Sequence, residues 1–316
     1  MNHRPRPAVG VAMVLAGSIL FAVNGTVSKL ASATGIDSPQ LTTLRASGAA
    51  LGLFALVLAV RPSRLRITRR ELPMLVAYGL AGFFAVPMLY FVAINRMPVG
   101  IGLLFEYTAP VLVALWARFV QGHAVRPRLW AGLAACLAGL ACVAEIWGRL
   151  RLDTLGVLAA LASAVLLAAY YLLSARGVVS RDTLSLTAYA FGVSALAGAV
   201  LRPWWRFDPS VLFRLTDNSQ TGHLPVWLLL TYIVIGGSIA PYLLIAGAMR
   251  HLPPTSVGII GMAEPVVATA VAWLVLHEHL NAAQIAGGAL ILAGVALAET
   301  ARVKAEPSDP SCVPPN

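Results

Sequence analysis

Ten apolar runs follow one another along this chain of 316 residues. Each is about 20 residues long, and a helix of that length, rising 1.5 Å per residue, crosses the ~30 Å hydrocarbon core of a bilayer. Only 11% of the residues are charged, whereas soluble domains average about 25%. The sequence therefore predicts an all-α polytopic membrane protein with ten transmembrane helices, at Val9–Ser32, Pro39–Val60, Leu72–Ile94, Gly100–Val120, Leu129–Trp147, Leu155–Ala175, Leu184–Leu201, Val226–Met249, Ser256–His277 and Ala283–Ala301.

The basic residues between the runs indicate the orientation. If the N-terminus is cytoplasmic, the inside segments hold fifteen Lys and Arg residues and the outside segments hold six. Cytoplasmic loops of membrane proteins carry such an excess. We therefore expect a multi-pass protein of the plasma (inner) membrane with both termini in the cytoplasm. The net charge of +10 then reports topology, and no nucleic-acid partner is expected.

The two halves of the chain resemble each other in sequence. A shift of 154 residues places the third run on the eighth, and a shift of 155 places the fourth and fifth on the ninth and tenth. The aligned pairs include Tyr78/Tyr232, Gly82/Gly236, Pro87/Pro241, Arg96/Arg250, Pro110/Pro265, Gly132/Gly287 and Gly139/Gly294. We expect two five-helix repeats, residues 9–147 and 155–301, followed by a disordered cytoplasmic tail, residues 302–316. Since five is odd, the second repeat enters the membrane from the opposite side, and inverted repeats of this kind typify secondary transporters that work by alternating access.

The stretch from Ala240 to Glu278 carries the most informative residues. Two apolar runs meet at a short basic turn, and the second run holds Glu264 directly before Pro265. Proline leaves backbone carbonyls unbonded in a helix, and a carboxylate in hydrocarbon is costly unless it is paired or hydrated. Together they indicate a segment that lines a cavity.

The second half carries a motif from Glu264-Pro265-Val266 through Trp273 and Glu278 to Gln284, Gly287 and Gly294, and the first half begins with FAVNGTVSKL, which includes Asn24 and Lys29. These residues resemble the EamA-type drug/metabolite transporters over nearly the whole chain. The resemblance implies ten helices, a central cavity lined by the first four helices of each half, and export of small metabolites such as amino acids. Two features of the first half depart from the pattern. The acid expected near Gly122 is missing, and Glu106 lies four residues before Pro110 instead of one.

Four ionisable residues lie inside predicted helices: Lys29, Arg45, Glu106 and Glu264. Each costs about 2.5–3.5 kcal/mol at a helix centre on insertion scales. Counted from the outer helix ends, Arg45 and Glu106 both lie ~9 Å deep, so an ion pair between them is expected, with a purely structural role for Arg45 as the alternative. Lys29 is a candidate for substrate binding or coupling, with extension of its side chain to the outer interface as the alternative. Glu264 is expected to carry a proton, and Glu106 to bind Arg45 or a substrate amine.

Other residues are candidates for contact with a substrate or for gating. Tyr90, Tyr107 and Tyr170 can stack on a substrate or donate a hydrogen bond to it, or serve ordinary packing, and Asn24 interrupts the first apolar run. We expect Pro87, Pro110, Pro241 and Pro265 to bend gating segments. The glycine pairs of the fifth and tenth runs predict either packing within the chain or a homodimer interface.

The sequence motifs that would indicate an enzyme are incomplete or missing. His277-Glu278 begins like a zinc-protease motif, but Asn281 occupies the position of the second histidine, and no phosphate-binding loop is present. No catalytic residue, metal or cofactor is expected. The sequence thus favours a secondary transporter that moves small metabolites, amino acids or drugs, outward across the lipid bilayer, with proton coupling as one mode and passive facilitation as the other. The alternatives from another class are an intramembrane enzyme and a scaffold.

The orientation can be tested with single cysteines. In a background without Cys136, Cys142 and Cys312, a cysteine at Ser63 should react with a membrane-impermeant reagent only from the cytoplasmic side, and one at Gly222 only from outside. Labelling of both from one side would contradict the predicted topology.

Overall fold

The computed structural model describes residues 6–60, 62–94, 96, 99–122, 125–147, 153–216, 223–267, 270 and 281–303. Within these ranges the predicted all-helical fold is confirmed. The first half comprises α1 (Pro7–Ala33), α2 (Ser38–Val60), α3 (Leu72–Tyr78), η2 (Gly79–Ala85), α4 (Val86–Ile94), α5 (Val99–Glu106), α6 (Ala109–Phe119) and α7 (Pro127–Val143). The second comprises α8 (Thr154–Ser180), α9 (Thr183–Leu201), α10 (Val226–Val234), η5 (Ile235–Ile239), α11 (Ala240–Ala248), α12 (Pro254–Gly261) and α14 (Ala282–Val303).

Eight helical stretches in the described residues are long and apolar enough to span a membrane, and α7 is a shorter apolar helix. The ninth predicted helix is described only in part, as α12 and the helical residues 264–267 and 270. Residues 271–280 and the predicted disordered tail beyond Val303 lie outside the described part of the chain.

Two of the continuous helices that the sequence predicted are broken. The fourth run changes from α5 to α6 through a turn at Tyr107 and Thr108, and the ninth leaves α12 through a turn at Met262 and Ala263. The two breaks are 155 residues apart, and each lies just before a repeat-related proline. Pro110 is in the first turn of α6, where its missing N–H leaves no carbonyl unbonded.

The other two repeat-related prolines follow wide turns. The π-helical segments η2 and η5 come directly before Pro87 and Pro241. A proline cannot donate to the carbonyl four residues earlier, which for Pro87 is that of Phe83. That carbonyl instead accepts hydrogen bonds from Ser194 Oγ at 2.9 Å and from Arg45 Nη2 at 3.3 Å. The Phe83 oxygen therefore has hydrogen-bond donors from the side chains of two neighbouring helices.

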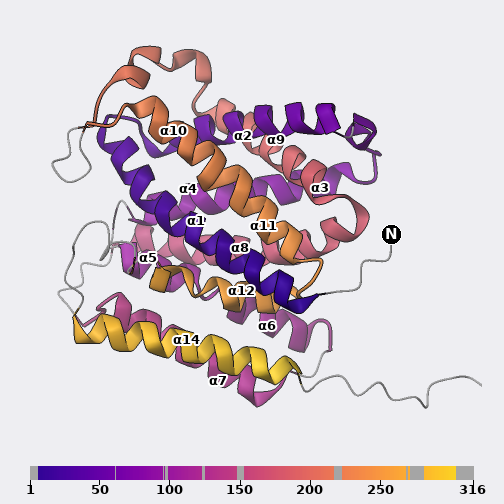
Figure 1. Cartoon of the computed structure of the whole chain (residues 1–316), viewed down its shortest axis with the longest axis vertical. Coiled ribbons are helices and arrows are strands. Elements are labelled where there is room, and N and C mark those ends of the chain that lie inside the picture. Colours follow the sequence, from indigo (N-terminus) through magenta and orange to yellow (C-terminus); the bar gives the residue numbers. More distant parts are fainter. Residues whose placement is uncertain are drawn as a thin grey trace, which may run out of the picture.

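Helices α7 and α14 pack against each other as a layer at one edge of the molecule, at the bottom of Figure 1. Gly132 faces the carbonyl of Gly294, and Gly139 faces that of Gly287, so the two helices run antiparallel. A β-carbon on Gly132 or Gly139 would lie 2.6 Å from the facing oxygen. The glycine pairs thus permit close packing within the chain, one of the two alternatives that the sequence left open.

The remaining helix contacts follow one pattern. Helix α2 packs on α9, and these two helices are at equivalent positions of the two repeats. The contact of α1 with α11 has its counterpart in the contact of α8 with α4. The arrangement is therefore nearly unchanged when the two halves exchange places.

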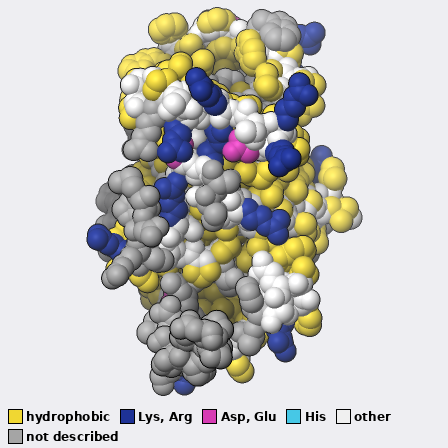
Figure 2. Space-filling view, turned by 90° about the vertical axis from the view of Figure 1, so that its right-hand side faces the viewer, with side chains coloured by type: hydrophobic (Ala, Val, Ile, Leu, Met, Phe, Trp, Pro, Cys, Tyr) yellow, Lys and Arg dark blue, Asp and Glu magenta, His cyan; other side chains and the backbone are white. Residues whose placement is uncertain are grey.

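The two ends of the bundle differ in charge. Helix α1 begins and α14 ends on the right-hand side of Figure 1, which we call the terminal side. Figure 2 views this side and shows Lys and Arg side chains gathered on it. The opposite end carries the segment 202–216, which we call the loop side. There Arg202 Nη2 lies 2.7 Å from Asp37 Oδ2, and Val211 and Leu212 pack on a cluster that includes Ile36.

The close α7–α14 packing makes a stability prediction with an internal control. Alanine at Gly287 would place its β-carbon 2.6 Å from the Gly139 carbonyl oxygen, whereas at neighbouring Gly288 the nearest atom would lie 3.5 Å away. Because the backbones must separate, Gly287→Ala should destabilise the protein by about 1–3 kcal/mol. Gly288→Ala should be neutral or slightly stabilising, since alanine is the better helix former. Thermal unfolding of the purified variants in detergent measures both, and equal midpoints would contradict the predicted difference.

Candidate substrate cavity

A cavity of about 170 Å³ lies among helices of both halves. Its walls are mainly apolar and aromatic, with a few polar groups, which is the usual composition of a small-molecule site. The polar and ionisable residues that line it are Ser18, Asn24, Ser28, Arg45, Tyr90, Glu106, Tyr107, Tyr170, Tyr171, Tyr242 and Glu264.

Seven of the site residues that the sequence suggested meet in this cavity: Asn24, Arg45, Tyr90, Glu106, Tyr107, Tyr170 and Glu264. Pro87 lines it as well. The other three prolines, Pro110, Pro241 and Pro265, are buried in the helix contacts beside it. The side chain of Lys29 lies outside the described residues.

Both acids are placed by the helix breaks. Glu106 is the last residue of α5, and the helix after the second break resumes at Glu264. Tyr107, in the first break, donates a hydrogen bond of 2.8 Å from its hydroxyl to Glu264 Oε2. This bond joins the two breaks across the two halves of the chain.

Glu106 lies near the second acid and near a polar group of α8. Its carboxyl faces the Ser163 hydroxyl and is close enough to Glu264 for the two to interact electrostatically. Two carboxyl groups in one poorly hydrated cavity attract a cation or a proton, because each disfavours a negative charge on the other.

Arg45 does not form the expected ion pair with Glu106; within the described residues no acidic oxygen lies within 4 Å of its guanidinium. Besides the hydrogen bond to the Phe83 carbonyl at 3.3 Å, its Cζ lies 5.9 Å from the centre of the Tyr242 ring. The physical reason is local: the Phe83 carbonyl, four residues before Pro87, accepts the hydrogen bond of the arginine.

A cluster of aromatic rings lies beside the cavity, and two of its members, Tyr170 and Tyr242, line it. The ring of Phe83 lies 4.3 Å from that of Tyr242 and 4.7 Å from that of Phe191, centre to centre. Tyr170 stacks on Tyr78 at 5.4 Å, so it packs as well as lining the cavity. The sequence analysis missed Phe83 and Tyr242; the position of Tyr242 directly after a repeat-related proline was the signal that could have identified it.

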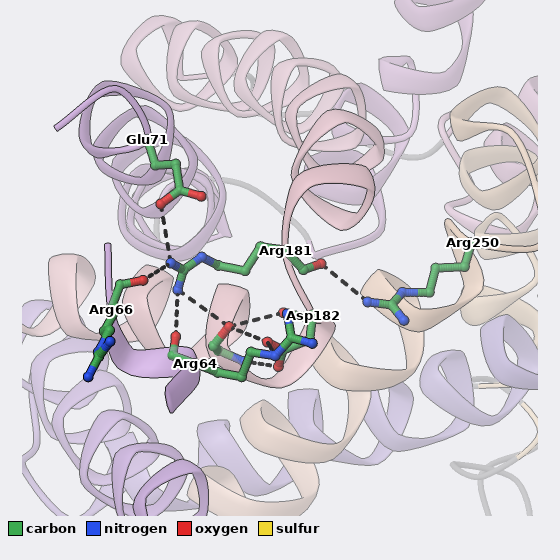
Figure 3. Close-up of polar contacts among 7 residues, drawn as sticks. Arg64, Arg66, Glu71, Arg181, Asp182 and Arg250 are labelled. Atoms are coloured by element: carbon green, nitrogen blue, oxygen red, sulfur yellow. Dashed lines mark hydrogen bonds and ion pairs between the residues drawn. The ribbon is translucent and has the colours of Figure 1, made fainter. Parts of the chain in front are cut away.

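On the terminal side, a polar network surrounds Arg181 (Figure 3). The Arg181 side chain is 7% exposed. It donates to the carbonyls of Arg64 at 2.9 Å and Arg66 at 2.6 Å, and its Nη2 lies 3.3 Å from Glu71 Oε2. Arg250 in turn donates to the Arg181 carbonyl at 3.2 Å. The network thus joins the α2–α3 connection, the α8–α9 turn and the turn after α11.

The residues that line the cavity come from several levels of the bundle. Arg45 lies in the half of α2 nearer the loop side, whereas Tyr170 and Tyr171 lie in the half of α8 nearer the terminal side. Gly25 is exposed, and a β-carbon on it would meet no atom within 4 Å. The lining of the cavity thus includes an exposed residue of α1.

Comparison with known proteins identifies relatives of the whole chain. The model of the EamA-like transporter family matches twice, at residues 8–144 and 154–300. The two matches cover most of the chain and coincide with the two halves that the internal similarity indicated.

Individual relatives carry transporter names. The chain is 28% identical to an uncharacterised transporter of Archaeoglobus fulgidus, over 92% of this chain and 96% of the relative. It is 25% identical to the threonine/homoserine exporter RhtA of Escherichia coli K12, over 84% of each chain. It is 26% identical to the pseudopaline exporter CntI of Pseudomonas aeruginosa, over 92% and 96%. A solved crystal structure that is 24% identical shares the fold, with a TM-score of 0.74 over 95% of this chain and 99% of that one.

The Arg181 network makes a prediction about stability and pH. The backbone N–H of Thr68 and then the Arg181 guanidinium lower the pKa of Glu71 from its ordinary value of 4.5. A carboxylate with a lowered pKa stabilises the fold above its unfolded pKa, and this stabilisation is lost as the pH falls through the folded value. Glu71→Gln should therefore lower the free energy of unfolding at pH 7 by about 1 kcal/mol, measured as a lower thermal unfolding midpoint. The difference from the wild type should vanish well below pH 4.5.

The matched control for this change is Arg96→Gln, which removes one partner of an ion pair that is about half exposed on both sides. Exposed pairs contribute little, so its midpoint should equal that of the wild type. A Glu71→Gln difference that persists unchanged at low pH would contradict the assigned role of the carboxylate.

Proposed function

The chain belongs to the EamA-like transporter family, and from that membership and the central cavity we propose that it is a secondary transporter of small metabolites with an amine group, such as amino acids. It moves them outward across the inner membrane by alternating access. The family and the relatives are transporters, which also argues against an enzyme or a scaffold.

One observation carries the proposal: the two carboxyl groups at the helix breaks share one cavity with aromatic walls. A substrate ammonium group is attracted by carboxylates and by the faces of aromatic rings. Transporters commonly build substrate sites from interrupted helices near the middle of the membrane. Glu106 and Glu264 occupy such interruptions, in elements at equivalent positions of the two halves.

Alternating access requires two gates that open in turn. The antiparallel packing of α7 and α14 and the exchangeable contacts of the two halves support an inverted repeat. In this scheme the network around Arg181 is the inner gate. Pro87 and Pro241, with their π-turns, and Pro110 and Pro265, at the breaks, provide the bends about which the gates move.

The two acids take different roles. Glu264 carries the proton, and its hydrogen bond from Tyr107 at 2.8 Å links its state to the break in the other half. Glu106 binds the substrate amine. The exporter names of the relatives support the outward direction, and the threonine/homoserine exporters among them suggest amino acids as the first compounds to test. A passive facilitator of the same fold is the alternative.

Proteoliposomes test the proposal. Purified protein should give saturable flux of at least one compound from a panel of labelled amino acids that includes threonine and homoserine, and a proton gradient should accelerate it. Glu264→Gln should abolish the acceleration because an amide carries no proton. Glu106→Gln should raise the half-saturation concentration about 10-fold or more, as expected for the loss of a charged hydrogen bond.

Asp208→Asn, which changes an exposed acid on the loop side, serves as the control and should behave as the wild type. A Glu264→Gln variant that keeps its response to the gradient would contradict the role of Glu264 and favour the facilitator. Absence of flux for every compound in the panel would contradict amino-acid transport.

A further inference from the structure

Three residues that line the cavity each have a buried polar atom without a hydrogen-bond partner: Asn24 (Oδ1), Ser28 (Oγ) and Arg45 (Nε). Ser28 is 4% exposed and Arg45 is 5% exposed. Buried polar groups nearly always have a partner, and one without it loses the free energy of its hydration. Unpartnered polar atoms gathered in one cavity therefore indicate a missing ligand.

Arg45 also has no ion-pair partner among the described residues. Its contacts among the described residues are neutral, namely the Phe83 carbonyl and the ring and hydroxyl of Tyr242. Glu264 accepts its hydrogen bond from Tyr107 instead. A buried cation is costly unless an anion pairs with it, and a guanidinium presents a rigid fork of N–H donors that fits a carboxylate.

The two polar residues of α1 provide further donors. Asn24 and Ser28 are four residues apart, so they lie on the same face of the helix. A serine hydroxyl donates one hydrogen bond, and an asparagine amide, turned about its side-chain bond, donates two. A cationic fork together with neutral N–H and O–H donors is chemistry suited to an oxyanion.

We propose that Arg45, Ser28 and Asn24 form a carboxylate-binding subsite in the cavity. The substrate is then a zwitterion, with its carboxylate at Arg45 and its ammonium at Glu106. This inference rests on the proposed function for the ammonium end, but it assigns a separate group of residues. It also explains how Arg45 and Glu106 line one cavity without forming an ion pair, because the substrate supplies a counter-charge to each.

Fragments of one amino acid test the two ends separately. Alanine carries both charges, propionate carries only the carboxylate, and ethylamine carries only the ammonium. Binding of each to the full-length protein in nanodiscs is measured by the shift of the thermal midpoint at constant ionic strength. Arg45→Gln should weaken propionate and alanine about 10- to 100-fold, as expected for charged hydrogen bonds, and leave ethylamine within about twofold. Glu106→Gln should do the reverse.

Two further variants keep the test independent of folding. The glutamine side chain ends two bonds short of the position of Nη2, so Arg45→Lys, which keeps the charge, is the conservative variant and should keep part of the propionate binding. Ser28→Ala removes a hydroxyl that has no partner in the structure, so it should fold normally and weaken propionate several-fold. Arg96→Gln, which removes an exposed positive charge, should bind all three fragments as the wild type does.

The outcomes separate the subsite from the transport proposal. Propionate binding that depends on Arg45 supports the subsite even if proteoliposomes carry no amino acid, a result that would overturn only the transport proposal. The subsite is overturned if propionate binds Arg45→Gln as tightly as the wild type, if the variant loses ethylamine equally, or if propionate does not bind the wild type.

Discussion

A backbone carbonyl released inside a bilayer finds no water, so the protein itself must supply its hydrogen-bond donor. The structure depends on this constraint at Phe83. Pro87 cannot bond to the Phe83 oxygen, and Ser194 and Arg45 donate to it instead. The Phe83 oxygen therefore links α2, which carries Arg45, and α9, which carries Ser194, to the π-helical turn before Pro87.

The two helix breaks also combine a structural and a polar role. Each break places a carboxyl group in the cavity, and Tyr107 of one break donates to Glu264 of the other. A structural change at either break therefore alters the surroundings of the acid in the other half. Because helices that cross hydrocarbon gain little from apolar contact with one another, such polar links are well suited to couple the halves. The link is a property of the pair of halves and belongs to neither alone.

The sequence predicted the features that follow from composition, length and repetition. Apolar runs predicted the helices, and the cost of charge in hydrocarbon placed Glu106, Glu264 and Arg45 at a cavity that the structure contains. It did not predict the partner of Arg45, because depth along a helix gives no direction around it. In the sequence, Arg181 was only one of the basic residues that indicate the topology. The buried network of Arg181 depends on the carbonyls of Arg64 and Arg66, and backbone acceptors have no sequence signature.

The distribution of packing separates a rigid part from the parts that a transport cycle has to move. Facing glycines bring the backbones of α7 and α14 so close that one added β-carbon would lie 2.6 Å from an oxygen, and such a contact permits little sliding. The terminal side is closed instead by hydrogen bonds and ion pairs at Arg181, which exchange with water at small net cost where they reach the interface. In the proposed transport cycle, the closely packed backbones are the frame and the polar contacts around Arg181 are the gate. This division follows from the energetics of the two kinds of contact. The glycine pairs Gly132/Gly287 and Gly139/Gly294 lie in the fifth helix of each half, within the frame, whereas the repeat-related prolines lie in the third and fourth helices, next to the cavity.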